Sequence, residues 1–152
     1  MFRIYQSKRF VTYDCLWYDI ATSEDTNKWN NLGVTATYSD NGTNIKPNTN
    51  YRYQIKYSIV DDLVIEFDVY IPSTVTNNPV LYVRGQSPTL NASDVSRDNW
   101  HTYRIECRNL NMKYYCDGEY LFEQNPPSVN STFQFRVTNS ELTFKNFRIY
   151  PI

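Results

Sequence analysis

The sequence predicts an all-β fold, a two-sheet antiparallel jelly-roll sandwich. Apolar and polar residues alternate with a period of two along most of the chain, as they do in strands that bury one face. Tyr and Phe are abundant, at 14 and 8 of 152 residues, and aromatic rings favour pleated, half-buried surfaces. Turn-forming residues, Asn above all, separate the alternating stretches. We expect one domain over residues 1–152, with its core from about residue 10 to residue 152.

The first half of the chain is expected to contain strands over residues 10–18, 34–38, 51–59 and 63–71. The clearest is 63–71, because its odd positions are all apolar while Glu66, Asp68 and Tyr70 occupy even positions. Pro72 ends this strand, since proline has no N–H to donate to a neighbour. A short helix near residues 23–28 is also expected, because Ser23 can cap it.

The second half is expected to contain strands over residues 80–84, 100–108, 112–116, 119–123, 131–138 and 142–150. Asp117-Gly118 predicts a tight hairpin, because both residues tolerate the positive φ that such a turn needs. Residues 109–111 predict another turn. Lys145-Asn146 interrupts the alternation of its strand, as a β-bulge would. Trp100, at the start of its strand, is expected to plug the open end of the sandwich.

Charge and hydropathy argue against two classes of partner. The net charge is −1 and no block of Lys and Arg occurs, so nucleic acid is not expected as a partner. No apolar run approaches the ~20 residues of a membrane helix, so membrane insertion is not expected. The first nine residues lack the apolar stretch of a signal peptide. We therefore expect a cytoplasmic chain, a piece of a longer protein, or a virion component made inside a host.

The three cysteines and the one histidine do not predict a cross-link or a metal site. Cys107 and Cys116 flank the turn at 109–111 in diagonal positions, so they are expected to be buried small hydrophobes rather than a disulfide. A His-based metal cluster is not expected, because His101 is the single histidine.

Several stretches, in this order, resemble the concanavalin A-like lectin/glucanase superfamily. They are EFDV at residues 66–69, WHTYRI at 100–105, a strand that ends in Asp117-Gly118, and FKNFRIY at 144–150. The resemblance extends from about Phe10 to the C-terminus and implies a LamG-like jelly roll. It also makes a structural calcium ion possible, with ligands in loops 23–27 or 40–44. No other cofactor or metal is expected.

The catalytic motif of the superfamily is incomplete in this chain. Its retaining glucanases place Glu, an apolar residue, Asp and then a second Glu on one strand. Glu66 and Asp68 match the first half, but Tyr70 and Ile71 stand where the second Glu should be. Without a second carboxyl group the leaving oxygen has no general acid, so a non-catalytic member is expected. A glycoside hydrolase in which Glu106 supplies the acid stays as an alternative.

The polar positions of the strands form the predicted ligand-binding site. Carboxylates and guanidinium groups bond to sugar hydroxyls, and tyrosine rings stack on the apolar faces of sugars. The predicted site comprises Glu66, Asp68, Tyr70, Tyr82, Arg84, Arg104, Glu106, Tyr115 and Arg136. A competing interpretation is that these residues form ordinary cross-strand pairs on a solvated sheet.

Three functions follow from these observations. The first is a non-catalytic, lectin-like domain that binds a glycan or cell-surface polysaccharide. It would serve as a receptor-binding or adhesion module of a virus or phage tail, or of a cell surface, as part of a larger assembly. Such modules commonly form homotrimers. The second is a structural decoration or assembly domain of a virion or surface layer. The third is the hydrolase with a relocated acid.

Overall fold

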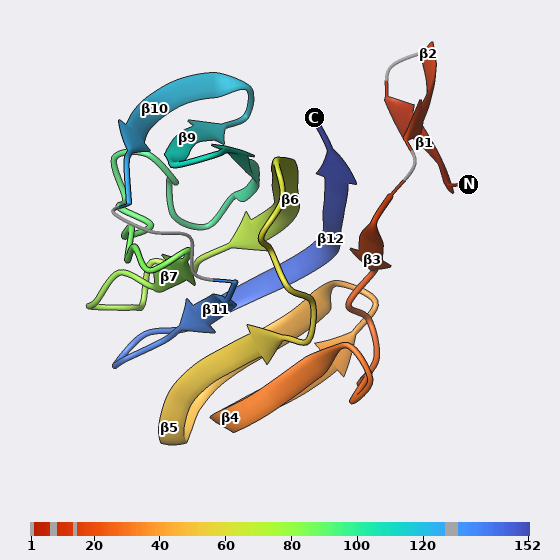
Figure 1. Cartoon of the computed structure of the whole chain (residues 1–152). Helices are drawn as coiled ribbons and strands as arrows, with labels where there is room; N and C mark the ends of the chain where they lie inside the picture. The colour runs from red at the N-terminus through yellow and green to blue at the C-terminus, as the bar shows by residue number, and fades with distance from the viewer. Residues whose placement is uncertain (1, 7–8, 14, 127–130) are drawn as a thin grey trace.

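The computed structural model describes residues 2–6, 9–13, 15–126 and 131–152 (Figure 1). These residues form strands, turns and loops and contain no helix, and so none that could cross a membrane. The expected helix near residues 23–28 is wrong. The backbone there makes a single turn, in which the N–H groups of Lys28 and Trp29 both bond to the carbonyl oxygen of Asp25. The turn goes no further because a strand begins at Trp29, whose side chain is buried.

The described residues form twelve strands. They are β1 (Phe2–Gln6), β2 (Arg9–Tyr13), β3 (Trp17–Asp19), β4 (Trp29–Ser39), β5 (Gly42–Ile55), β6 (Leu63–Tyr70), β7 (Val80–Val83), β8 (Trp100–Arg108), β9 (Asn111–Cys116), β10 (Glu119–Gln124), β11 (Phe133–Arg136) and β12 (Leu142–Pro151). β1 and β2 pair only with each other. The rest form a curled antiparallel sheet in the order β10-β9-β8-β6-β12-β5-β11-β7, with β3 beside β12 and β4 beside β5.

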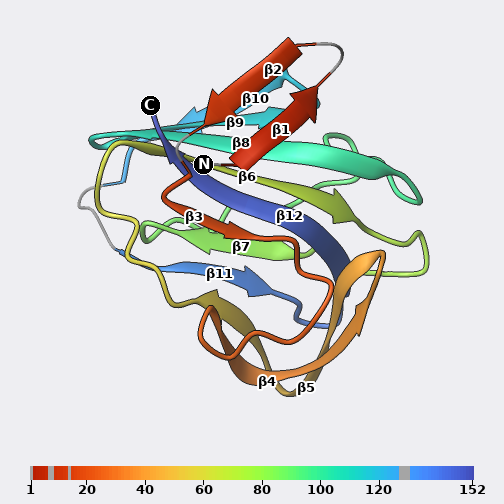
Figure 2. The same cartoon turned by 90° about the vertical axis from the view of Figure 1, so that its right-hand side faces the viewer.

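The curled sheet folds over itself into two layers (Figure 2). One layer carries β10, β9, β8, β6 and β12, and the other carries β7, β11 and part of the long β4–β5 hairpin. The layers meet through buried rings: the centroid of Phe67 in β6 lies 5.1 Å from that of Phe135 in β11. Because side chains alternate along a strand, the neighbours of Phe67 and of Phe135 point outward in opposite directions. The all-β sandwich prediction is confirmed.

The core is unusually rich in aromatic rings around Trp29. The ring of Trp29 stacks on Tyr53 at 5.0 Å and meets Phe144 at 5.1 Å and Phe147 at 5.3 Å. Its indole N–H donates to the carboxylate of Asp19 at 2.6 Å, so the polar atom of this buried ring is satisfied. Trp29 thus joins strands β3, β4, β5 and β12.

The predicted turns and bulge are confirmed. β9 ends at Cys116 and β10 begins at Glu119, and Asp117 and Gly118 between them have φ values of 50° and 85°. The pairing of β12 with β6 shifts register between Lys145 and Arg148, and Asn146 there has a φ of 50°. Asp, Asn and Gly adopt the left-handed region more readily than other residues, which is why these turns were visible in the sequence.

Strand bounds agree best where one face is buried along the whole strand. β8 matches its prediction in full and β6 ends one residue early. The hairpin of β4 and β5 is much longer than predicted, because residues 46–50 are exposed on both sides and carry no alternation. The predicted strand 10–18 is two strands, β2 and β3, which join different partners.

Candidate functional site

A row of polar and aromatic side chains crosses the outer face of the layer that contains β6. Glu66 stands at its centre, paired in register with Arg104 of β8 on one side and Arg148 of β12 on the other. Arg104 lies opposite Tyr115 of β9, which lies opposite Tyr120 of β10. We call the outer surface of β6, β8, β9 and the adjoining part of β12 the polar face.

Glu66 and Arg148 form a largely buried ion pair within the polar face. Arg148 donates from Nε to Glu66 Oε1 at 2.7 Å and also from Nη2 to the same oxygen. The hydroxyl of Tyr150 donates to the other carboxylate oxygen at 3.4 Å. The side chains of Glu66 and Arg148 are 13% and 8% exposed. Both charges are therefore partly removed from water and depend on each other.

Arg104 is held on the polar face and still faces solvent. Its Nη2 donates to Glu106 Oε1 at 2.7 Å, and its guanidinium lies 5.8 Å from the ring centroid of Tyr115. The side chain is 38% exposed, so part of the guanidinium faces solvent, while its Nε is buried without a hydrogen-bond partner among the described residues.

Asp68 accepts hydrogen bonds at both of its carboxylate oxygens. Thr102 Oγ1 donates to one at 2.9 Å, and Asn146 Nδ2 donates to the other at 2.8 Å. Asn146 is the bulge residue of β12, so the bulge directs an amide group toward the polar face. These contacts fix the carboxylate of Asp68 in position.

Trp100 lies on the polar face, and the prediction that it plugs the end of the sandwich is wrong. It is 39% exposed, its ring centroid lies 5.7 Å from that of Tyr70, and Lys145 Nζ lies 4.1 Å from its ring centroid. Trp100 and Arg104 both occupy even-numbered positions of β8, so their side chains point to the same, outer side of the sheet. The alternation of side chains along the strand would therefore have placed Trp100 correctly.

Two adjacent hollows open on the polar face. One has a volume of about 380 Å³ and the other about 290 Å³, and Thr102 and Asp117 line both. The first is also lined by Glu66, Arg104 and Gly118, and the second by Asp68, Trp100, His101 and Lys145. Carboxylates, cationic groups and an indole ring therefore border the two hollows.

Arg84 is not part of a binding surface, so this prediction is wrong. Its side chain is fully buried and donates to the carbonyl oxygens of Ile59 and Asn109, each at 3.0 Å, and to that of Asp61. β7 ends at Val83, and Arg84 has a φ of 48°, so the alternation of the strand no longer determines where its side chain points.

Tyr82 and Arg136 lie on the outer face of the opposite layer, so their inclusion in one site with Glu66 is wrong. Arg136 stacks over the ring of Tyr82 at 4.1 Å and donates to Gln134 at 3.0 Å. Phe135 and Phe67 meet in the core between the two layers. Their neighbours in the sequence, Arg136 and Glu66, therefore point outward from opposite layers. The structure brings the remaining predicted residues together: Glu66, Asp68, Tyr70, Arg104, Glu106 and Tyr115.

The polar face includes functional candidates that the sequence analysis missed. Arg148 was visible in the sequence, because the alternation of Phe147 and Ile149 after the bulge turns it outward. Lys145 was visible as well, because it follows the buried Phe144 in the alternation and is paired with Asp68 just before the register shifts.

In the loops proposed for calcium, Asp25 and Asn44 contact other groups of the protein. A carboxylate oxygen of Asp25 accepts the N–H of Asn27 at 3.0 Å, and the other lies 3.6 Å from Lys28 Nζ. In the second loop, Asn44 turns its amide nitrogen toward Glu141 at 3.2 Å. Calcium stays a prediction from the resemblance.

Solved structures with the same fold include carbohydrate-active proteins. The carbohydrate-binding module CBM66 from Bacillus subtilis has 14% identity and a TM-score of 0.66, over 82% of this chain and 96% of that one. A galectin-like protein of unknown function from Bacillus subtilis has 8% identity and a TM-score of 0.66, over 91% and 98% of the chains. A Bacillus licheniformis β-glucanase has 10% identity and a TM-score of 0.59, over 90% and 97%.

These likenesses confirm the jelly-roll fold. No family model and no curated protein matches the sequence. At identities of 8–14% the neighbours do not assign an activity, since one fold serves many functions. The function must be argued from the polar face.

Proposed function

We propose that this chain is a non-catalytic domain that binds a glycan across the polar face. The observation that carries the proposal is the pair of adjoining hollows with the exposed ring of Trp100 at their border. Sugars offer an apolar face to an aromatic ring and hydroxyl pairs to charged groups, and this face provides both. The binding module and the glycan-acting proteins that share the fold support the same class of ligand.

Each part of the polar face has a distinct role in the proposed complex. The ring of Trp100 stacks on one sugar residue, next to the ammonium group of Lys145. Arg104 donates to hydroxyls in the adjoining hollow. Tyr115 and the 55%-exposed Tyr120 extend the surface beyond Arg104, so the site suits a chain of several sugars.

The hydrogen bonds of the carboxylates favour binding over hydrolysis. Glycoside hydrolysis needs one carboxyl group as nucleophile or base and another as proton donor. Glu66 is paired with Arg148, Asp68 accepts from Thr102 and Asn146, and Glu106 accepts from Arg104. Tyr70 stands where the superfamily has its second Glu. On this face we therefore propose that the acidic groups position other side chains and accept hydrogen bonds from sugar hydroxyls.

Two substitutions on the polar face are expected to remove glycan binding. Trp100→Ala deletes the stacking surface and Arg104→Ala deletes the exposed guanidinium. Each is expected to weaken binding at least ~10-fold, equal to about 1.4 kcal/mol. The glycan is chosen from a broad glycan array, and the dissociation constants are measured by titration calorimetry.

Matched controls lie on the opposite layer. Tyr82→Ala and Arg136→Ala remove the same kinds of side chain from the other outer face and are expected to leave the dissociation constant unchanged. If the controls lose binding while Trp100→Ala and Arg104→Ala keep it, the glycan binds to the opposite layer and the proposed site is wrong. No signal on the array for the wild-type chain would refute glycan binding.

Incubation with mixed β-glucans tests the alternative of a hydrolase. No reducing ends are expected to accumulate, and Glu66→Gln is expected to keep its glycan affinity. Accumulation of reducing ends that stops in Glu66→Gln or Glu106→Gln would replace the binding proposal by hydrolysis.

A place in a virion, phage tail or cell surface, and a homotrimeric state, stay predictions from the sequence. The mass of the chain in solution addresses the alternative of a decoration or assembly domain. Obligate assembly predicts a stable oligomer that buries aromatic surface, whereas a binding module of this size can act as a monomer.

A further inference from the structure

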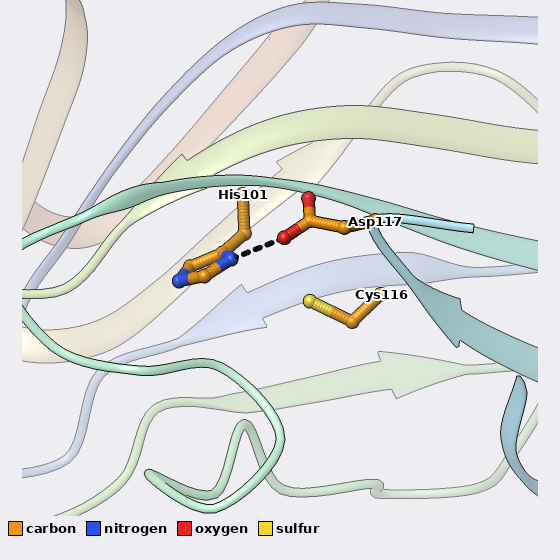
Figure 3. Close-up of side chains that lie close together, drawn as sticks. All are labelled: His101, Cys116 and Asp117. Carbon is orange, nitrogen blue, oxygen red and sulfur yellow. Dashed lines mark hydrogen bonds and ion pairs between the residues drawn. The ribbon is translucent and has the colours of Figure 1, made fainter. Parts of the chain in front are cut away.

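Three side chains with metal-binding atoms converge at one end of the sandwich, beside the hollows of the polar face. They are His101 of β8, Cys116 at the end of β9 and Asp117 in the turn that follows, and we call them the end cluster (Figure 3). His101 and Cys116 occupy inward-facing positions of their strands, like Tyr103 and Tyr114. The end cluster therefore lies where the space between the layers opens to solvent.

The spacing of the end cluster suits a single ion. One nitrogen of His101, the sulfur of Cys116 and one oxygen of Asp117 all lie within 4.8 Å of one another, and His101 Nδ1 is 2.6 Å from Asp117 Oδ2. Zinc binds nitrogen, oxygen and sulfur at about 2.0–2.3 Å, so two of its ligands lie at most ~4.6 Å apart. Small side-chain rotations are enough to bring all three atoms to one ion.

The other nitrogen of His101 is already held by the protein. Nε2 lies 3.1 Å from the carbonyl oxygen of Ser96 and 2.9 Å from its hydroxyl. With Nε2 held at Ser96, a metal ion would take the place of the proton in the 2.6 Å hydrogen bond that now joins His101 Nδ1 and Asp117 Oδ2. A backbone carbonyl on the second ring nitrogen is a common support for a metal-binding histidine.

The surroundings of the end cluster are acidic and accessible. A hollow of about 390 Å³ reaches these residues and is also lined by Asp94 and Glu119. A divalent cation in the hollow would be attracted by these carboxylates.

We propose that His101, Cys116 and Asp117 bind one zinc-type divalent cation at the end of the sandwich. One imidazole, one sulfur and one carboxylate form a donor set that suits Zn²⁺ and not Ca²⁺ or Mg²⁺, which prefer oxygen ligands alone. Three protein ligands leave a fourth position for water or a ligand atom. His101 and Asp117 also line the hollows of the polar face, but the proposed glycan contacts at Trp100 and Arg104 are not metal ligands, and the metal site can be tested without a glycan.

Titration of the reduced, chelator-treated full-length chain with Co²⁺ tests the proposal, because a cobalt–thiolate bond gives a near-ultraviolet charge-transfer band. One equivalent is expected to saturate this band, and Zn²⁺ is expected to abolish it by displacement. Cys116→Ser is expected to lose the band, and His101→Gln is expected to weaken Co²⁺ binding at least ~10-fold. Cys15→Ser, which removes a cysteine outside the end cluster, is expected to keep both.

Thermal unfolding provides the second measurement. A bound ion stabilises the folded state, so millimolar Zn²⁺ is expected to raise the unfolding temperature of the wild type and of Cys15→Ser but not of Cys116→Ser. A near-native melt of Cys116→Ser without metal shows that the variant folds. Absence of both the band and the thermal shift in the wild type would overturn the proposal, as would a band that Cys15→Ser loses and Cys116→Ser keeps.

Discussion

Arg84→Ala is expected to destabilise the fold by roughly 3–5 kcal/mol, because it removes three hydrogen bonds and a large buried side chain together. The guanidinium of Arg84 bonds to carbonyl oxygens of residues 59, 61 and 109, which belong to two segments far apart in the chain. Without it the carbonyl of the buried Ile59 loses its donor, and the carbonyls of the exposed residues Asp61 and Asn109 are left to bond to water. Urea unfolding followed by circular dichroism measures the change.

Arg136→Ala is the matched control for this prediction, since it removes the same side chain from an exposed face. It is expected to change the free energy of unfolding by less than about 1 kcal/mol. Equal losses in the two variants would mean that the buried hydrogen bonds of Arg84 do not stabilise the end of the sandwich.

Glu66→Ala is expected to lower the free energy of unfolding by about 3–5 kcal/mol, because it leaves the charge of Arg148 buried without its partner. Arg148 is only 8% exposed and directs two of its N–H groups at Glu66. Glu66→Gln keeps an acceptor oxygen in the same place and is expected to cost less. The free energy of unfolding is again measured in urea.

A double-mutant cycle measures the coupling energy between Glu66 and Arg148. Glu66→Leu with Arg148→Met replaces both charges by apolar groups and is expected to recover much of the loss seen in either single variant. Losses that simply add in the double variant would show that Glu66 and Arg148 are not coupled.

The parts of the fold that the sequence predicted are those that local patterns determine. The alternation of apolar and polar residues predicted β6 and β8, where one side faces the core throughout. Asp117-Gly118 predicted the hairpin of β9 and β10. The long β4–β5 hairpin was missed because its middle is exposed on both sides. Alternation requires one buried side, so it disappears where a hairpin extends beyond the core.

The placement of the candidate site residues was predicted in part, for a physical reason. Strand parity tells which side of a strand faces out, and it correctly grouped Glu66 with Arg104. It does not tell which layer a strand joins, so Arg136 was assigned to the same surface although its strand belongs to the opposite layer. Parity also ends with the strand, which is why the buried Arg84 was predicted to be exposed.

The most direct test of the central claim follows the indole N–H signals of Trp100 and Trp29 by NMR during titration with the glycan that gives the strongest array signal. We expect the signal of the exposed Trp100 to move in a saturable way, together with amides of β6 and β8. The buried indole of Trp29, bonded to Asp19, should stay in place. Shifts confined to β7 and β11, around Tyr82 and Arg136, would contradict the account.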